Sequence, residues 1–246
     1  MNSMSKVENA LKTFANGGVI LVYDSSGREG EVDMMILGTY VTPEMVRRLR
    51  LEAGGLLCVA IDNKLADNLG IPYYHQLVEA AASSYPALER LLRKKMPYGD
   101  APAFSITINH KSVYTGISDH ERALTIRRFA TLCSEYRNNP EALREAVAAE
   151  FSTPGHVHLL ISSKSLFSGR RGHTEYAVAL AKLAGRIPVV ALAEMLDDDE
   201  PRALPIEKAE RIARERGYQL LYGSEIEEFW KSVARGEVDE DSYSSF

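Results

Sequence analysis

The sequence predicts a single α+β domain in which helices are layered against a mixed β-sheet. Apolar segments of strand length alternate with segments of helical period, the pattern expected of a sheet covered by helices. Several predicted strands follow one another without a helix between them, so antiparallel neighbours are expected beside parallel ones. No Pro-, Gly- or Ser-rich linker interrupts the 246 residues, and we therefore expect one domain over residues 1–246.

The first half of the chain begins with a helix and continues mainly as strands. Apolar residues recur with a helical period over residues 7–16, and Gly17-Gly18 supplies the stop. Thr42 is a favourable N-cap residue and Pro43 suits the first turn of the helix that follows. The expected elements are a helix over 7–16, strands over 19–23 and 32–38, a helix over 42–51 and a strand over 56–61.

In the second half of the chain, segments with a helical period and apolar segments of strand length alternate more regularly. A turn at His110-Lys111 separates two short apolar segments, and longer helical patterns follow. The expected elements are strands over 103–109 and 112–115, helices over 124–136 and 140–150, a strand over 157–162, a helix over 174–184, a strand over 188–193, a helix over 205–217 and a strand over 218–222.

Charge and composition argue against several classes of protein. A net charge of −5 does not suit a protein that binds nucleic acid through a broad basic field. Two cysteines cannot form a disulfide framework, so reduced thiols are expected. No apolar run approaches the ~20 residues that span a bilayer, and the N-terminus lacks the features of a secretion signal. We expect a cytoplasmic protein that binds neither nucleic acid nor membranes, with a frayed acidic tail over residues 236–246.

Residues 28–33 place three carboxylates and an arginine between two predicted strands. Side chains two residues apart share one face of a strand, so Glu31 and Asp33 should lie together, with Glu29 leading into them. Oxygen ligands beside Arg28 suit a hard divalent cation and an anionic substrate. The alternative, a charged hairpin tip without a task, stays open on residue types alone.

A second polar group opens the helix expected over residues 174–184. Glycines, Arg170 and Arg171 precede a helix whose first N–H groups are free, a combination that predicts a phosphate site. His173 lies at the mouth of this helix, where a neutral ring nitrogen can ligate a metal. The alternative is an ordinary capped helix with surface arginines, since Thr174 or Ser168 is able to cap it.

Three further features give weaker signals. His156 and His158 share one face if their strand is regular. Thr115 belongs to a glycine-bearing hydroxyl loop, and Glu194 ends a predicted strand, where a carboxylate commonly faces a ligand crevice. Cys58 is most simply a small buried hydrophobic residue.

Taken together and in this order, these segments resemble the 3,4-dihydroxy-2-butanone 4-phosphate synthase family of riboflavin biosynthesis. The resemblance spans residues 7–222 and rests on six motifs in the family's order. The motifs read REGEVD (28–33), GGLLCV (54–59), TGIS…RALTI (115–126), GHV (155–157), RRGHTE (170–175) and LAE (192–194). The resemblance is to the stand-alone form, because the chain is too short to hold the GTP cyclohydrolase to which many relatives are fused.

The resemblance implies a three-layer α/β/α arrangement around a mixed twisted sheet, a fold shared broadly with YrdC-like proteins. It implies a carbon–carbon lyase that converts D-ribulose 5-phosphate into L-3,4-dihydroxy-2-butanone 4-phosphate and formate. The implied cofactor is Mg²⁺, two ions per site, with Mn²⁺ able to substitute, and the implied assembly is a homodimer. The metal would stabilise an enediolate during a skeletal rearrangement.

The site residues follow from the resemblance, motif by motif. The implied metal ligands are Glu29 and His173. The implied catalytic proton carriers are His156, Glu194 and Glu31. The implied substrate contacts are Arg28, Glu29, Asp33, Thr115, Arg170, Arg171, Gly172, His173, Thr174 and Glu194.

The sequence departs from the family in three places. Many members show Asn-Glu-Gly-Asp after the Arg-Glu pair, where this chain has Gly30-Glu31-Val32-Asp33. An Asp-Arg pair is common where this chain has Glu121-Arg122, and residues 97–103 match only loosely, through Tyr98 and Gly99. The alternative from another class is a YrdC-like protein that binds nucleotides or RNA. That family lines its cavity with basic residues, whereas the candidates here are mostly carboxylates and histidines.

Overall fold

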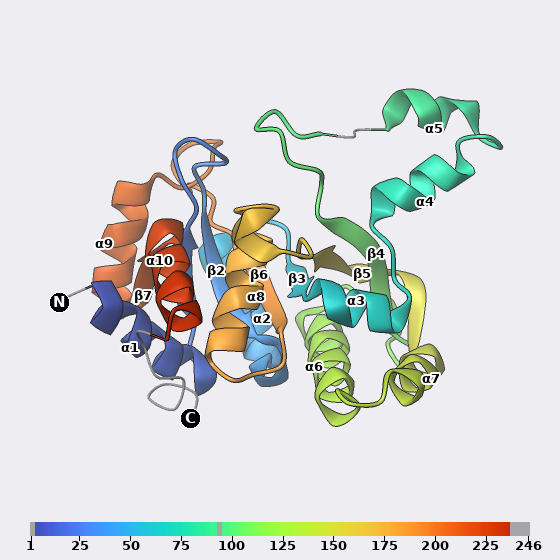
Figure 1. The fold of residues 1–246 in the computed structure, drawn as a ribbon, viewed down its shortest axis with the longest axis horizontal. Helices are drawn as coiled ribbons and strands as arrows, with labels where there is room; N and C mark the ends of the chain where they lie inside the picture. Colours follow the sequence, from blue (N-terminus) through green and yellow to red (C-terminus); the bar gives the residue numbers. More distant parts are fainter. Residues whose placement is uncertain (1–2, 93–94, 237–246) are drawn as a thin grey trace.

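One seven-stranded mixed sheet forms the centre of the protein, with helices on both of its faces (Figure 1). The structure, a computed structural model, describes residues 3–92 and 95–236. The strands are β1 (Ile20–Tyr23), β2 (Val32–Leu37), β3 (Cys58–Ile61), β4 (Phe104–His110), β5 (Phe151–Ile161), β6 (Val189–Glu194) and β7 (Gln219–Tyr222). Their order is β4-β5-β3-β6-β2-β1-β7. The predicted mixed sheet is confirmed.

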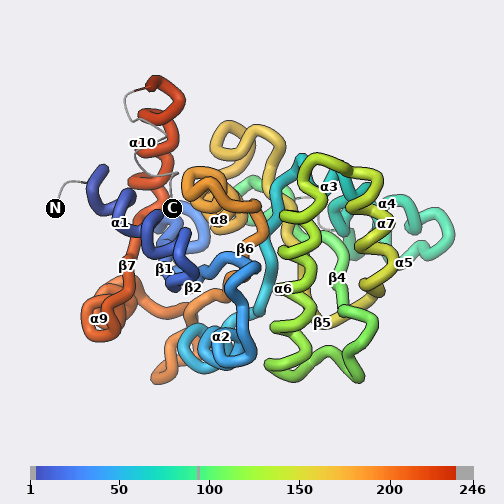
Figure 2. The backbone as a smooth tube through the Cα atoms, turned by 90° about the horizontal axis from the view of Figure 1, so that it is seen from below, coloured from blue at the N-terminus to red at the C-terminus, as the bar shows by residue number. Residues whose placement is uncertain are grey.

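The helices pack in two layers that enclose the sheet. They are α1 (Ser3–Ala15), α2 (Pro43–Arg48), α3 (Asn63–Leu69), α4 (Tyr74–Ala81), α5 (Pro86–Leu91), α6 (Asp119–Glu135), α7 (Pro140–Glu150), α8 (His173–Leu183), α9 (Ile206–Arg216) and α10 (Gly223–Ala234). Helices α1, α8 and α10 cover one face, and α2 and α9 lie across the sheet from them (Figure 2). The three-layer arrangement implied by the resemblance is therefore confirmed. Within the described residues, no helix combines the length and apolar character needed to cross a membrane.

Alternation along the strands divides the apolar side chains between two cores. Leu21 and Met34 join the core under α2, α6 and α9, whereas Ile20 and Met35 join the core under α1, α8 and α10. All four side chains are fully buried, and burial of each contributes about 1.5–3 kcal/mol to folding. A slip of one residue would exchange the two sets, so both cores together specify the register.

The register of the central strands places residues from separate motifs opposite one another. β2 pairs with β6 antiparallel, and Asp33 lies opposite Glu194. β3 pairs with β6 antiparallel and with β5 parallel, so that Cys58 lies between Leu192 and His158. The β2–β6 pairing places the start of β2 beside the end of β6.

The strand expected over residues 112–115 is absent, and this prediction is wrong. These residues form a turn whose backbone N–H groups are held by the carboxylate of Glu121, which accepts from Tyr114, Thr115 and Gly116 at 2.7–3.2 Å. A side chain that binds backbone N–H groups competes with ladder pairing, which explains the missing strand. The departure at Glu121 thus has a structural role.

Several helices were not expected from the sequence. Helices α4 and α5 have no buried residue and extend away from the body of the protein (Figure 1). α4 nevertheless has apolar residues on one side, so its helical period is present in the sequence. The acidic tail predicted over 236–246 lies, apart from Gly236, outside the described residues.

Gly155 provides a test of the packing between β4 and β5. A Cβ atom at this position would lie 2.0 Å from the backbone carbon of Ile108, in contact that only movement of the strand relieves. We expect Gly155→Ala to lower the free energy of unfolding by about 2 kcal/mol. Gly27→Ala is the control, because nothing lies within 4 Å of its Cβ position. Urea unfolding of both variants gives the comparison; equal midpoints would contradict the close packing.

Candidate active site

The loop between β1 and β2 is organised by Asp24, which follows β1 and is 4% exposed. Its carboxylate accepts hydrogen bonds from three consecutive backbone N–H groups, those of Glu29 (3.0 Å), Gly30 (3.0 Å) and Glu31 (3.1 Å). An Asp that binds the backbone a few residues later is a common means of fixing a tight loop. The side chains of Glu29 and Glu31 are thereby held at defined positions.

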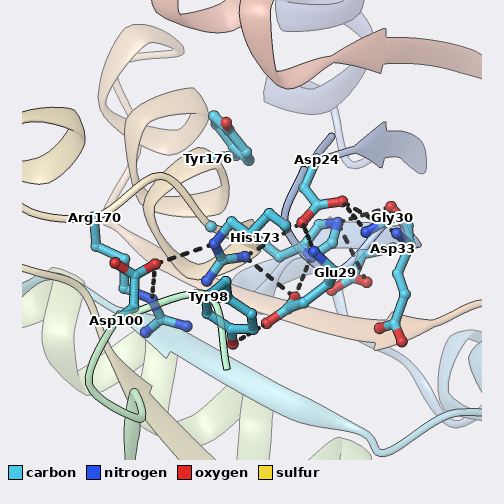
Figure 3. A network of polar contacts seen from close by, with 12 residues as sticks. Asp24, Glu29, Gly30, Asp33, Tyr98, Asp100, Arg170, His173 and Tyr176 are labelled. Atoms are coloured by element: carbon cyan, nitrogen blue, oxygen red, sulfur yellow. Dashed lines mark hydrogen bonds and ion pairs between the residues drawn. The ribbon is translucent and has the colours of Figure 1, made fainter. Parts of the chain in front are cut away.

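His173, the first residue of α8, lies against this loop and is 5% exposed (Figure 3). Its Nδ1 lies 3.3 Å from Oε2 of Glu29, and its Nε2 lies 3.2 Å from the carbonyl oxygen of Glu31 and 3.6 Å from Oδ1 of Asp33. Burial alone would lower the pKa of His173, but the carboxylates of Asp33 and Glu29 raise it above its usual value. Residues from β2, its preceding loop and α8 therefore meet here.

The residues present fit a divalent cation. Asp24, Glu29 and His173 each offer one ligand atom, and these atoms lie within 4.8 Å of one another. Asp33 Oδ1 is buried without a hydrogen-bond partner, so a further acceptor faces the group. Carboxylate oxygens with one imidazole nitrogen are a donor set that Mg²⁺ and Mn²⁺ accept. Both sequence-derived ligands, Glu29 and His173, belong to this group, and Asp24 joins them.

Other carboxylates lie beside the group. Asp33 is 1% exposed, and its burial raises the pKa, as do the charges of Glu194 and Glu29, while His173 acts in the opposite direction. The pKa of Glu31 is also raised, first by burial and then by the charges of Glu29 and Glu194. Three carboxyl groups, Glu31, Asp33 and Glu194, thus surround the position where a substrate would meet the metal ligands.

Two arginines extend the site on one side. The guanidinium of Arg28 lies 4.5 Å from the ring centre of Tyr98 and donates from Nε to Asp100 (3.2 Å). Arg28 reaches this position only because residue 172 is glycine, since a Cβ there would lie 2.5 Å from Nη2 of Arg28. Arg170 points to the same place, with Nε 4.0 Å from Asp100 (Figure 3).

Arg171 and the start of α8 depart from a simple phosphate cradle. The side chain of Arg171 is 63% exposed and pairs with Glu227 at 3.5 Å, whereas that of Arg170 is 13% exposed. Thr174 is buried, and Glu175 accepts from the N–H of Gly172 at 3.2 Å. The two arginines therefore point in different directions, Arg170 toward Asp100 and Arg171 toward Glu227. Glu175 caps part of the helix N-terminus.

Two predicted residues lie apart from the metal-ligand group. The backbone N–H of His156 donates to Asn109 at 2.8 Å, and Asn109 in turn donates to the carbonyl oxygen of Thr115 at 3.1 Å. His156 lies on β5, which β3 and β6 separate from β2. Three strand spacings correspond to about 14 Å. One chain does not bring His156 and Thr115 to Glu29 and His173.

Four site residues were not assigned from the sequence: Asp24, Tyr98, Asp100 and Asn109. Asp24 had a readable signal, because an Asp between a strand and a turn-rich loop is a common loop organiser. Tyr98 and Asp100 lie about 70 residues from the residues they contact, and nothing in the local pattern indicates the contact. Asn109 contacts the nearby Thr115 and the distant His156. Cys58 is buried in β3, where burial raises the pKa of its thiol, in agreement with a structural role.

Comparison with known proteins identifies the family. The model of 3,4-dihydroxy-2-butanone 4-phosphate synthase matches residues 8–229. Proteins of that name from Methanothermobacter thermautotrophicus and Archaeoglobus fulgidus are 38% and 37% identical, over 92% and 94% of this chain and 96% of each relative. The chain belongs to the 3,4-dihydroxy-2-butanone 4-phosphate synthase family. This family acts in riboflavin biosynthesis, and the YrdC-like alternative finds no support.

Solved structures agree with this family. A 3,4-dihydroxy-2-butanone 4-phosphate synthase in complex with two magnesium ions aligns with a TM-score of 0.74 and 25% identity, covering 94% of this chain and 99% of the other. The same synthase name describes a cation-free structure that aligns with a TM-score of 0.72. The fold of the chain is that of the synthase family.

The neighbouring arginines supply a matched pair for testing phosphate recognition. Arg170→Ala should weaken the binding of inorganic phosphate by at least tenfold, because a guanidinium shielded from water makes a strong charge-assisted contact. Arg171→Ala should bind like the parent protein, because exposed charges contribute little. Calorimetric titration with phosphate measures both. A larger loss at Arg171 would reverse the assignment.

Proposed function

We propose that this chain converts D-ribulose 5-phosphate into L-3,4-dihydroxy-2-butanone 4-phosphate and formate with a bound divalent cation. The observation that carries the proposal is the group formed by Asp24, Glu29 and His173, which lies next to Arg28 and Arg170. Metal ligands and phosphate-binding cations side by side suit a phosphorylated ketose. Substrate and products balance in atoms without an added oxidant or reductant, so no redox cofactor is needed.

The side chains around the substrate have distinct parts in this proposal. Arg170 and Arg28 bind the phosphate and so fix the sugar's orientation. The free Oδ1 of Asp33 accepts a hydrogen bond from a substrate hydroxyl. Glu31 and Glu194 hold and move protons at the carbon atoms that rearrange. A bound Mg²⁺, or Mn²⁺ in its place, supplies Lewis-acid polarisation of the substrate oxygens, and two ions per site are proposed.

We also propose that the protein works as a cytoplasmic homodimer whose active sites are shared. His156 and Thr115 are exposed, and the strand of His156 lies about 14 Å from β2, which follows the loop of Glu29. Apolar side chains beside them, Tyr114 and Ile117, are 98% and 56% exposed, a state that association of two chains would relieve. In the dimer, the partner's His156 is the proton carrier that completes the site.

The metal assignment is tested with two substitutions. Glu29→Ala and His173→Ala should each abolish Mg²⁺-dependent formate release from ribulose 5-phosphate, because each removes a ligand atom. Exposed His120 provides the control, and His120→Ala should retain the parent rate. Formate is measured enzymatically with and without EDTA, and circular dichroism checks the fold. Full activity in either folded ligand variant would refute the assignment.

Mixing two inactive variants tests the shared site. His156→Ala and His173→Ala should each be inactive alone. After they are unfolded and refolded together, about half of the dimers contain one of each, and each of those has one intact site if the partner contributes His156. Formate release should then return to about a quarter of the parent rate per site. No recovery in mixed dimers verified by mass spectrometry would contradict sharing between subunits.

A further inference from the structure

A tight turn ahead of β4 lies directly over the two arginines. It is closed by hydrogen bonds between Met96 N and the Asp100 carbonyl (2.7 Å) and between Gly99 N and the Met96 carbonyl (2.9 Å). At its tip, Tyr98 donates from its hydroxyl to Oε1 of Glu29. Its last residue, Asp100, accepts from Nε of Arg28 at 3.2 Å. The turn is therefore held at one end by a metal ligand and at the other by an arginine.

The Asp100 carboxylate takes the position that an external anion would use. Its Oδ2 lies 3.2 Å from Arg28 and 4.0 Å from Arg170, so it is placed between two guanidinium groups. These groups are still not satisfied: Nη2 of Arg28 and Nε of Arg170 are buried without a hydrogen-bond partner. Other carboxylates also lie close, Glu29 at 3.2 Å from Arg28 and Glu175 at 3.6 Å from Arg170, yet these two buried N–H donors stay open. Open donors suit an anion that has more oxygen atoms.

We propose that Asp100 is an internal competitor for the phosphate-binding arginines, and that substrate phosphate displaces it together with the turn. Asp100 and Glu175 both lie beside Arg170, so an anion that arrives there is repelled by two carboxylates in a site that screens charge poorly. Glu175 is fully buried in α8, so Asp100, which lies on the turn, is the one that can move. The proposal rests on the proposed function only in naming the phosphate of a sugar as the natural anion. In this proposal Asp100 acts only on the binding of the anion and has no part in the reaction of the sugar carbons.

The structure has room for the displaced carboxylate. A cavity of about 370 Å³ lies beside the turn, lined by Asp100, Arg170, Ser163 and His75 among others. Nδ1 of His75 is buried without a hydrogen-bond partner. Asp100 can turn into this space while the sheet and its two cores remain as they are, since the turn precedes β4 and adds nothing to either core.

An internal competitor affects all external anions in one characteristic way. The apparent dissociation constant is the intrinsic value divided by the fraction of molecules in which the arginines are open. That fraction does not depend on which anion binds. Removing the competitor should therefore lower the apparent dissociation constants of phosphate and sulfate by the same factor. A residue that instead orients the arginines would weaken both anions when it is removed.

The test is calorimetric titration of inorganic phosphate and of sulfate into the full-length protein in EDTA, at constant ionic strength. Asp100→Asn keeps the shape and removes the charge, and it should tighten both anions by about tenfold, as expected for loss of a charged hydrogen bond. The matched control is Asp199→Asn, which changes the net charge equally at an 81% exposed carboxylate bound to Lys208. The control should bind both anions like the parent protein.

Each other outcome overturns the proposal. Unchanged or weaker anion binding in Asp100→Asn would mean that Asp100 does not compete. Different gains in affinity for phosphate and sulfate would exclude one shared opening of the arginines. An equal gain in Asp199→Asn would mean that the net charge of the protein causes the effect. Should Asp100→Asn misfold by circular dichroism, Tyr98→Phe takes its place, since it removes the hydrogen bond to Glu29 that holds the turn and keeps the ring against which Arg28 packs. It should tighten both anions about threefold. The titrations measure anion binding and not turnover. A protein that fails to release formate would contradict the proposed function without changing the outcome of this test.

Discussion

One buried carboxylate, that of Asp24, is the constraint on which the geometry of the site depends. It accepts hydrogen bonds from three backbone N–H groups of the loop between β1 and β2. Because those groups belong to consecutive residues, the carboxylate fixes the backbone from which Glu29 and Glu31 project. This backbone position places Glu29 within hydrogen-bonding distance of His173, which lies 144 residues later in the chain. A metal would add to this arrangement and need not create it.

The mixed sheet is the second condition for the site. Antiparallel pairing of β2 with β6 sets Asp33 beside Glu194, although 160 residues separate them in the chain. The parallel pairing of β3 with β5 sends His156 to the other side of β3. The same strand order therefore brings Asp33 and Glu194 together and keeps His156 apart from them. For this reason the proposed mechanism takes His156 from a second chain.

Local patterns predicted much of the fold, and contacts between distant segments account for what they missed. Strands such as β2 and β6 are continuous apolar runs, and α7 has both a helical period and Pro140 at its first turn, so all three were readable. The short helices α4 and α5 were not given bounds, although α4 has an amphipathic pattern. Arg28, Glu29 and His173 were assigned by resemblance and do meet. Neither the distance to His156 nor the contact of Asp100 with Arg28 could be read, because strand order and loop packing leave no trace in adjacent residues.

The outlying arm of α4 and α5 has a consequence for how the molecule opens. With no buried residue in either helix, the arm adds little to the free energy that separates the native protein from the unfolded chain. Its amides should therefore exchange with solvent through local openings that leave the sheet intact. The turn with Tyr98 and Asp100 is the continuation of this arm into β4. Access to the buried charges is thus governed by a low-stability unit attached to a rigid one.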